Sequence, residues 1–394
     1  MNILIASQYG PEFAGATGTV LRGLVDALAL QGHRVVVASH TAPAGARSSS
    51  QDCEIASVNL GSRSGRLAGL LGLDIPVCFL KSPATIARLV KQIKREKPDF
   101  VLAVYPIEDI VFSALVACRL TATPLVTWFH DLYFGAATGW RKRFASVLEP
   151  WITRSADVNL SISPAVRDWY RAQRGGNWDV LPHPIGAGEF ASLRAPAPRA
   201  KRTVFFCGAV YGNCESNLAQ LVSAVAQSPG VNLEIYTANG NAARRIVDIY
   251  ATGDARFRIS VATNRTRREV LDRMRSADVL YLPLTFDGAI PADELNTMFP
   301  TKSVEYLLSG KTLLVHVPRS TYVYERMRTQ PGVVLCTDPD AAALSHALRK
   351  SFEVAGRCQL HHGRTGLDQY APAAVAESLC AAASRVLQGG RACA

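Results

Sequence analysis

A lysine and a glutamate lie three residues apart in the segment NTMFPTKSVEYLLSG, which spans residues 296–310. Its apolar residues recur at helical spacing and predict a short helix that buries one face: Val304, Leu307 and Leu308. Thr301 is the expected N-cap, and Gly310 is the expected stop. Lys302 and Glu305 then share a face of the first turn.

This pair has two interpretations. It is either an exposed ion pair worth about 0.3 kcal/mol or part of a nucleotide site. In such a site Lys302 and the helix N-terminus would hold a diphosphate, and Glu305 would accept hydrogen bonds from the two hydroxyls of a ribose. A nucleoside diphosphate offers both groups, which would explain a cation and an anion one turn apart.

A second pair, His130-Asp131, ends the strand-like run PLVTWFHD at 124–131. Polar groups at that position are costly to bury unless they are paired or used. His130 could hydrogen-bond a substrate hydroxyl while Asp131 orients or deprotonates a group, which makes both catalytic candidates. The alternative is structural, with Asp131 capping a turn and His130 satisfying a backbone carbonyl.

Gly15 and Gly18 lie between the apolar run 2–7 and the helical pattern of 19–31. Glycines before a helix allow backbone N–H groups to approach an anion such as a phosphate. The spacing GATG is neither G-x-G-x-x-G nor a Walker motif, so a tight turn is an equal explanation.

These residues belong to a regular alternation of apolar runs and helical patterns, which predicts parallel sheets covered on both faces. The pattern breaks at 186–202, rich in Ala, Pro, Gly and Arg, which we interpret as a linker. We therefore expect an α/β protein with two Rossmann-like domains facing a cleft. The predicted domains are 1–190 and 200–370, with a C-terminal helix in 371–394 that packs back on the first. Ligands are expected beyond the carboxyl ends of the strands.

The net charge and the cysteine content limit the classes of partner and the compartment that we expect. The 394 residues carry a net charge of +11, which favours an anionic partner such as a phosphorylated substrate or an acidic membrane surface. Nine cysteines without a CxxC pair, and a start without a signal sequence, predict a cytoplasmic protein.

We expect no metal at the cluster Cys358, His361 and His362, which lacks a second ligand pair, and we interpret Asp338-Pro339-Asp340 as a helix cap.

A basic, aromatic segment lies in the first domain. It combines Trp140-Arg141-Lys142-Arg143 with Phe144, Val147, Leu148 and Trp151. Tryptophan beside basic residues is typical of a helix on an acidic membrane surface, and a solvated helix face is the alternative. No recognition motif for nucleic acid is present.

The segment 278–310 resembles the donor-binding part of retaining family-4 glycosyltransferases of the GT-B fold. Members carry P-(S/T)-K-x-x-E-Y after a strand ending in A-D-V-x-x-x-P, and this chain has Pro300 to Tyr306 and Ala277 to Pro283 in those places. Leu30-Gln31-Gly32-His33 and Val180-Leu181-Pro182-His183-Pro184 extend the resemblance over nearly the whole chain.

The resemblance implies that the second domain, 200–370, is the donor side and the first, 1–190, is the acceptor side. Glu305 would be the second glutamate of an E-x7-E motif and contact the ribose, His130 would lie near the sugar, and Lys302 would bind phosphate. The remaining donor-binding positions would be Gly15, Gly18, Gly208, Thr297, Met298, Phe299, Pro300 and Thr301. Two positions depart from the pattern. Thr297 replaces the first glutamate, and no basic pair follows Gly208, so Lys302 acts alone or with Arg265, Arg267 or Arg268.

The function this implies is transfer of a sugar, with retention and without metal or other cofactor, from a UDP- or GDP-linked donor to an acceptor hydroxyl. A saccharide or lipid-linked acceptor in surface polysaccharide or glycolipid synthesis would suit a protein peripheral to the inner face of a membrane. Two alternatives remain: a nucleotide-sugar epimerase or hydrolase, and a catalytically silent sugar-nucleotide-binding module.

Overall fold

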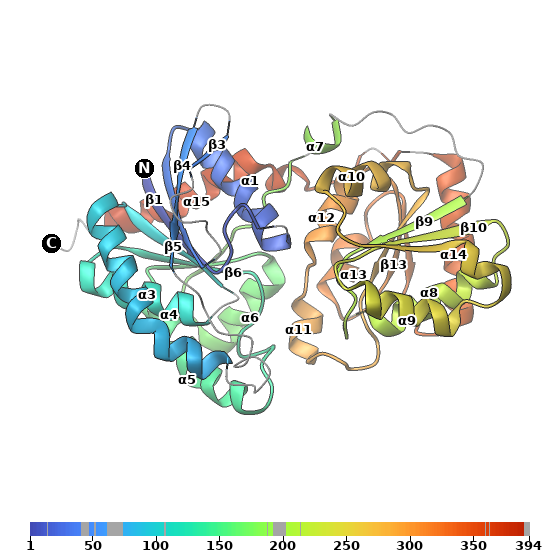
Figure 1. The fold of residues 1–394 in the computed structure, drawn as a ribbon, viewed down its shortest axis with the longest axis horizontal. Coiled ribbons are helices and arrows are strands. Elements are labelled where there is room, and N and C mark those ends of the chain that lie inside the picture. The colour runs from blue at the N-terminus through green and yellow to red at the C-terminus, as the bar shows by residue number, and fades with distance from the viewer. Residues whose placement is uncertain are drawn as a thin grey trace. The chain divides into compact units, whose positions relative to one another are not determined.

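The computed structural model describes residues 1–13, 15–40, 47–50, 53–60, 74–105, 108–186, 188–191, 202–212, 214–358, 360–361 and 363–389 (Figure 1). The chain divides into two compact units. Unit 1 comprises Met1–Ile185 and Asp368–Ala394, and unit 2 comprises Gly186–Leu367.

Unit 1 is built on an eight-stranded sheet in the order β3-β4-β2-β1-β5-β6-β7-β8. Its strands are β1 (Asn2–Ser7), β2 (Arg34–Ser39), β3 (Arg47–Ser50), β4 (Cys53–Asn59), β5 (Phe100–Tyr105), β6 (Leu125–Phe129), β7 (Val158–Ser161) and β8 (Trp178–Val180). All pairs are parallel except β3 with β4. The central strands β5 and β6 are buried along their whole length, as expected where helices cover both faces of a sheet.

The helices of unit 1 are α1 (Ala16–Leu30), α3 (Asp74–Glu96), α4 (Glu108–Thr121), α5 (Gly139–Ser155), α6 (Pro164–Arg174) and α15 (Pro372–Gly389), with a short 3₁₀ turn η2 (Asp368–Tyr370). The last helix packs on the first, far from it in sequence (Figure 1). Gln31 donates a hydrogen bond to the carbonyl of Ala373 at 3.0 Å, and Val375 and Leu379 are fully buried in the core of unit 1.

Unit 2 has a six-stranded, wholly parallel sheet in the order β11-β10-β9-β12-β13-β14. Its strands are β9 (Arg202–Cys207), β10 (Val231–Tyr236), β11 (Ile259–Ala262), β12 (Val279–Pro283), β13 (Thr312–His316) and β14 (Val333–Cys336). Its helices are α7 (Gly188–Ala191), α8 (Glu215–Ala226), α9 (Gly240–Tyr250), α10 (Arg267–Ser276), α11 (Ala292–Thr297), α12 (Thr301–Leu308), α13 (Tyr322–Met327) and α14 (Ala341–Arg357), with a 3₁₀ turn η1 (Gly253–Phe257).

The predicted fold class, two Rossmann-like sheets in one α/β chain, is confirmed. Three local features differ from the sequence expectation. Strands β3 and β4 were not expected, because Arg47–Ser50 is short and polar and carries no apolar run. Helix α3 begins at Asp74 and contains Pro83, whereas the helical pattern of the sequence predicts a start at residue 82. Of the expected linker, 192–201 falls outside the described residues, while α7 forms one helical turn.

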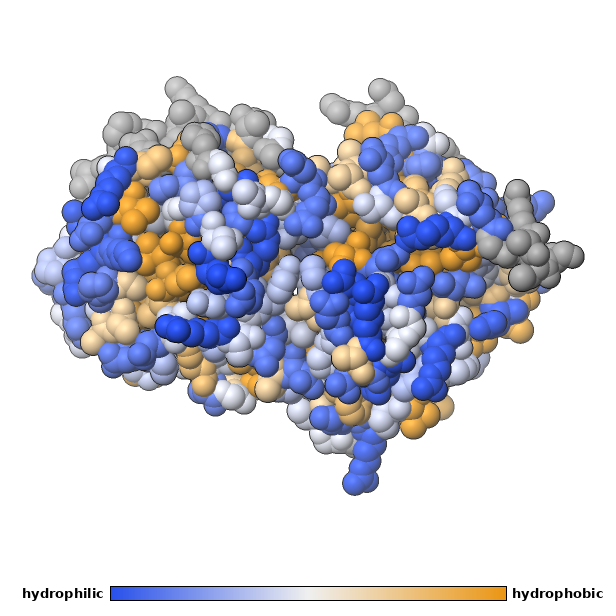
Figure 2. All heavy atoms as spheres, turned by 180° about the vertical axis from the view of Figure 1, so that it is seen from behind, coloured by the Kyte–Doolittle hydropathy of each residue, from blue (hydrophilic) through white to orange (hydrophobic). Residues whose placement is uncertain are grey.

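Large apolar side chains are mostly enclosed, and the exposed ones are few. On the face drawn in Figure 2, hydrophobic side chains reach the surface in several patches that hydrophilic side chains separate. None of the described helices combines the length and the apolarity that crossing a bilayer requires. His130 and Asp131 directly follow β6 in unit 1, and Lys302 and Glu305 lie in α12, between β12 and β13 of unit 2.

Candidate active site

The lysine–glutamate pair of α12 is part of a three-residue cluster in unit 2. Lys302 Nζ lies 2.6 Å from Glu305 Oε2, and Arg267 Nη1, from the first residue of α10, lies 2.5 Å from Oε1. The Glu305 side chain is only 1% exposed, whereas those of Lys302 and Arg267 are 27% and 25% exposed. One enclosed carboxylate therefore holds two cations that remain accessible, so the pair is not an isolated surface ion pair.

The protonation states of this cluster follow from its contacts. Burial would raise the pKa of the Glu305 carboxyl, but the positive charges of Lys302 and Arg267 outweigh it and hold that pKa below its ordinary value. Burial also disfavours the charged Lys302 ammonium, but neighbouring Cys207 and Glu305 raise its pKa. All three groups are ionised at neutral pH, and the cluster carries a net charge of +1, which suits an anion.

Strand β9 ends beside this cluster. The side chain of Cys207 is buried, and its backbone N–H donates a hydrogen bond to Tyr306 Oη at 3.0 Å. The N–H of Gly208, the next residue, donates to the carbonyl of Tyr236. Tyr306, one residue after Glu305, thus ties α12 to the carboxyl end of the strand that leads into Gly208.

The segment between α11 and α12 is well packed. Thr297 is buried, and its hydroxyl donates to the carbonyl of Asp293 at 2.8 Å. Met298 ends α11 and is half-buried, while the ring of Phe299 lies edge-on to Tyr322 at 5.4 Å. The threonine in place of the motif glutamate therefore caps its own helix backbone.

Pro300 is the N-cap of α12, and Thr301 is its first helical residue, so the expectation that Thr301 is the N-cap is wrong by one position. Pro300 has extended backbone angles that fit this place, and it offers no side-chain cap. Gly310 ends the helix with φ +70, as expected from sequence.

At the carboxyl edge of the sheet in unit 1, His130 directly follows β6. It is 7% exposed, and its ring lies edge-on to Trp128 at 4.3 Å and to His183 at 5.0 Å between centroids. Burial, and then the nearby His183, lower the pKa of His130 well below its ordinary value, so the imidazole is neutral. Its Nε2 atom has no hydrogen-bond partner among the described residues, and Asp131 beside it is exposed.

His183 is brought to this place by a contact that sequence could not show. Trp128 Nε1 donates to the carbonyl of Leu181 at 2.9 Å, which fixes the segment Val180 to Pro184 against the end of β6. Sequence reasoning used that segment only as a family motif and missed the histidine pair. It also missed His40 and Asp109, which lie 3.9 Å apart at the carboxyl end of β2 and the start of α4.

Gly15 and Gly18 both lie at the start of α1, and Gly15 is its N-cap in an extended conformation. A Cβ atom at Gly18 would lie 2.0 Å from the carbonyl oxygen of Phe13, and one at Gly15 would lie 2.5 Å from the Phe13 ring. Close packing of the loop on its own helix thus requires glycine at 18. The structure therefore supports the tight-turn interpretation of these two glycines. Their contact with a phosphate stays a prediction.

The cluster Cys358, His361 and His362 and the helix cap at Asp340 were also singled out by sequence. Among the described residues, no three histidine, cysteine, aspartate or glutamate side chains form a group that could hold a metal ion. His361 is hydrogen-bonded to Thr312, Cys358 is exposed, and His362 lies outside the described residues. Asp340 is confirmed as a helix cap, since its carboxylate accepts hydrogen bonds from Ala342 and Ala343.

Comparison with known proteins bears on these two sites. Residues 15–186 match the model of the glycosyl transferase 4-like domain. A sucrose-phosphate synthase from Thermosynechococcus elongatus is similar in structure, with a TM-score of 0.71 at 17% identity over 99% of this chain and 98% of that one. So is a trehalose 6-phosphate synthase from Burkholderia multivorans, with a TM-score of 0.66 at 14% identity over 99% of both chains. A comparison with curated protein sequences finds no match.

Residues 15–186 thus match a glycosyl transferase 4-like domain, and the whole chain has the fold of these two synthases. These findings confirm the resemblance indicated by the motifs. HepE from Anabaena in complex with UDP is also similar, with a TM-score of 0.61 at 15% identity over 99% of this chain and 98% of that one.

The donor residues expected from sequence in unit 2 lie around the carboxyl ends of β9 and β12. Lys302 and Glu305 are in contact with each other, and Arg267 is the one of the three suggested arginines that reaches Glu305. Arg265 pairs instead with Glu269, and Arg268 is exposed. The signal that could have selected Arg267 is Thr266, whose capping box with Glu269 fixes the start of α10.

Proposed function

We propose that this glycosyltransferase transfers a sugar from a nucleotide-diphosphate donor to an acceptor hydroxyl with retention of configuration. Unit 2 would bind the donor, and unit 1 would bind the acceptor. The observation that carries the proposal is the cluster of Arg267, Glu305 and Lys302, in which two accessible cations are held beside the N-terminus of α12. HepE, which is similar in structure, binds UDP, and this supports a UDP-linked donor.

In the proposed complex, Lys302 and Arg267 bind the donor diphosphate, while Glu305 sets their positions. Both Glu305 oxygens are engaged in the free protein. Movement of the Lys302 ammonium toward a phosphate oxygen would release Oε2, which could then accept a hydrogen bond from a ribose hydroxyl. With this exchange of partners, Lys302 would bind the phosphate and Glu305 would bind the ribose in the same complex.

The transfer step breaks the bond between the anomeric carbon and the diphosphate oxygen and forms a bond from that carbon to the acceptor oxygen. The acceptor proton passes to the departing diphosphate oxygen, whose charge Lys302 and Arg267 stabilise. A neutral His130 would act by hydrogen bonding to a sugar hydroxyl rather than by carrying charge, and Asp131 would orient the acceptor.

A two-stage experiment tests this function. Titration calorimetry with UDP, GDP and their sugars identifies the donor, and turnover is then measured with saccharide and lipid-linked acceptors. An α-linked donor that yields an α-linked product, read from the anomeric coupling in the proton NMR spectrum, supports retaining transfer. Donor hydrolysis or epimerisation without acceptor supports the first alternative, and binding without turnover supports the silent module.

We also propose that the protein contacts an acidic membrane surface through one face of α5. Its exposed face carries Val147 and Trp151, which are 74% and 47% exposed, between Arg143 and Arg154. On neighbouring α4, Leu120 is 66% exposed. Apolar side chains flanked by basic ones match an acidic bilayer surface in both hydrophobicity and charge.

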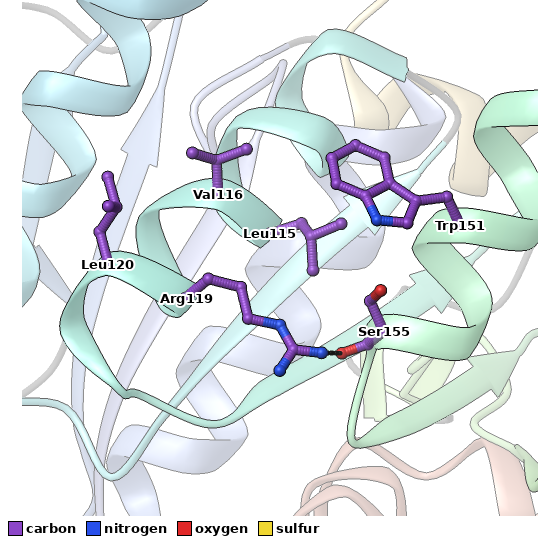
Figure 3. Close-up of a pocket in the computed structure, with 6 residues that line it drawn as sticks. All are labelled: Leu115, Val116, Arg119, Leu120, Trp151 and Ser155. Atoms are coloured by element: carbon purple, nitrogen blue, oxygen red, sulfur yellow. Dashed lines mark hydrogen bonds between the residues drawn. The ribbon is translucent and has the colours of Figure 1, made fainter.

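A pocket of about 310 Å³ lies beneath this face (Figure 3). Figure 3 shows Trp151 on one side, Leu115 between the helices and Arg119 donating a hydrogen bond to the carbonyl of Ser155 at 3.0 Å. The pocket lies where α4 and α5 end, whereas His130 follows the far end of β6. It is therefore separate from the His130 site and would accept apolar groups of a membrane.

Co-sedimentation with vesicles tests this contact. The variant V147S/W151S is expected to lose most binding to vesicles rich in acidic phosphatidylglycerol, and the matched variant I249S/Y250S changes two exposed apolar residues of α9 in unit 2. Binding should also fall as salt rises. Equal sedimentation of both variants and the unchanged protein would contradict the assignment of α5.

A further inference from the structure

The loop after His130 is attached to the core by a buried carboxylate. Glu149 of α5 is 0% exposed. Its Oε2 atom accepts hydrogen bonds from the backbone N–H of Phe134 at 2.8 Å and from Tyr170 Oη at 3.1 Å, and its Oε1 atom accepts one from Arg174 Nε at 2.8 Å. One side chain thus joins the loop, α5 and α6.

Tyr170 extends this attachment to a second loop residue. Its hydroxyl accepts a hydrogen bond from the backbone N–H of Tyr133 at 3.1 Å while donating to Glu149. The Tyr170 ring is stacked on Trp178 at 4.1 Å and 7°, which fixes the position of the hydroxyl. Two successive loop amides, at 133 and 134, are therefore bound by one rigid network.

The side chain of Phe134 is held as well. The Arg174 guanidinium lies 4.8 Å and Lys142 Nζ 4.9 Å from the centre of its ring, as in cation–π contacts. A Cβ atom at Gly135 would lie 2.5 Å from Leu132 Cδ1 and 3.0 Å from the Trp169 ring, so a larger residue there would require these side chains to shift. The segment that starts at His130 and Asp131 is consequently fixed at both ends, by β6 before it and by Glu149 after it.

A buried carboxylate is costly, and an apolar side chain of similar size often stabilises a fold as well. What an apolar residue could not do at 149 is accept hydrogen bonds from the loop backbone. The two amides follow His130 by three and four residues, so a shift of the loop would displace the imidazole and Asp131.

We propose that Glu149 is a positioning residue for glycosyl transfer, which binds the backbone of Tyr133 and Phe134 and so holds His130 and Asp131 in place for the sugar and the acceptor. This role rests on the proposed function of that loop. Glu149 itself touches neither substrate; it acts through the loop.

Three variants test it. Glu149→Gln removes the charge at nearly constant shape, and Tyr170→Phe removes only the hydroxyl and retains the ring stacking. Glu96→Gln is the control, because Glu96 is also buried in unit 1 and paired with arginine, at 2.6 Å from Arg34, but lies at the end of α3. If Glu149→Gln does not fold, Tyr170→Phe supplies the same comparison.

The first readout is hydrogen exchange, which needs no turnover. We expect the amides of Tyr133 and Phe134 to exchange at least about tenfold faster in Glu149→Gln and Tyr170→Phe, and at the unchanged rate in Glu96→Gln. Unchanged exchange in the first two variants would overturn the attachment of the loop.

The second readout is kinetic. We expect kcat to fall about tenfold or more in both loop variants, with the Kd for the donor unchanged because the donor cluster lies in unit 2. Faster exchange with unchanged kcat would overturn the positioning role. If the unchanged protein turns over no nucleotide sugar with any acceptor, the proposed function fails, and the exchange result still decides whether Glu149 holds the loop.

Discussion

The carboxyl edges of the two sheets place their polar groups in different electrostatic settings. In unit 2, Glu305 is enclosed and ionised between Lys302 and Arg267. In unit 1, His130 is enclosed and neutral against Trp128, and the charged cluster around Glu149 binds the backbone of the following loop.

The difference indicates which part of a nucleotide sugar suits each edge. Under the proposed function, the site with net positive charge suits a diphosphate, and the neutral hydrogen-bonding site suits sugar hydroxyl groups. The proposed function thus assigns the diphosphate to the edge of unit 2 and the sugar hydroxyls to the edge of unit 1, according to the charge state of a few enclosed side chains. The predictions below test that division.

The largest effect is expected from Glu305→Ala. Removing the carboxylate leaves Lys302 and Arg267, which are only partly exposed, as neighbouring like charges without their counter-ion, and we expect a loss of about 3 kcal/mol in the free energy of unfolding of unit 2. Urea unfolding followed by a probe in unit 2 measures it. The triple variant R267M/K302M/E305M, which removes all three charges, should recover most of that loss; a triple variant as unstable as Glu305→Ala would contradict the electrostatic origin.

Acid should destabilise unit 2 through His316, which is fully buried. Burial lowers the pKa of His316 to about 4, below its unfolded value of 6.5, so the folded state favours the neutral ring. Its Nε2 atom is hydrogen-bonded to the carbonyl of Asp338 at 3.0 Å. The stability this provides is present above pH 6.5 and is lost as pH falls toward 4, by roughly 2–3 kcal/mol between pH 7 and 4.5.

Urea unfolding at several pH values measures this loss. The variant His316→Gln should lose less stability over the same pH interval, because glutamine does not titrate. A variant with the same pH dependence as the unchanged protein would show that another group is responsible.

In unit 1, His130→Gln is expected to lower kcat about a hundredfold with the donor Kd unchanged, because a positioned hydrogen-bonding group near the sugar is lost. Since the pKa of His130 is well below its ordinary value, titration of this group should produce no change in rate between pH 8 and 6. Steady-state rates over that range measure both effects. A rate that depends on a group with a pKa near 6.5, and loses this dependence in His130→Gln, would refute the neutral imidazole.

A smaller effect is expected from Tyr306→Phe. The variant leaves the buried N–H of Cys207 without its acceptor, and we expect a loss of about 1 kcal/mol in the free energy of unfolding. Tyr250→Phe, at an exposed tyrosine, is the matched control. Equal stability of the two variants would mean that this contact does not hold α12 to β9.

Sequence predicted the periodic parts of the molecule well. The run at 2–7 is a strand with the expected bounds, because a continuous apolar segment before a helix is typical of a strand buried on both faces, and the helical pattern of 19–31 falls in α1 with a difference of one residue at its end. It did not predict β3, whose polar residues carry no periodic signal, or α11, which is short and lies in an expected loop.

The contact between Lys302 and Glu305 could be predicted, because the two residues are neighbours on one turn of a helix. Arg267 could be suggested only as one of three arginines, because its contact with Glu305 joins residues 38 positions apart. His183 and Glu149 reach the His130 loop through tertiary packing alone. Spacing along the chain contains no information about such contacts.

The most direct test of the central claim is a calorimetric titration of UDP and GDP into three proteins: the unchanged chain, R267M/K302M/E305M and the control Arg268→Met, which changes an exposed arginine of the same helix. The account predicts that one nucleotide binds the unchanged chain and the control equally, and that the triple variant, still folded, binds it at least about a hundredfold more weakly. A folded triple variant that binds the same nucleotide as tightly as the unchanged chain would contradict the claim that this cluster holds the donor diphosphate.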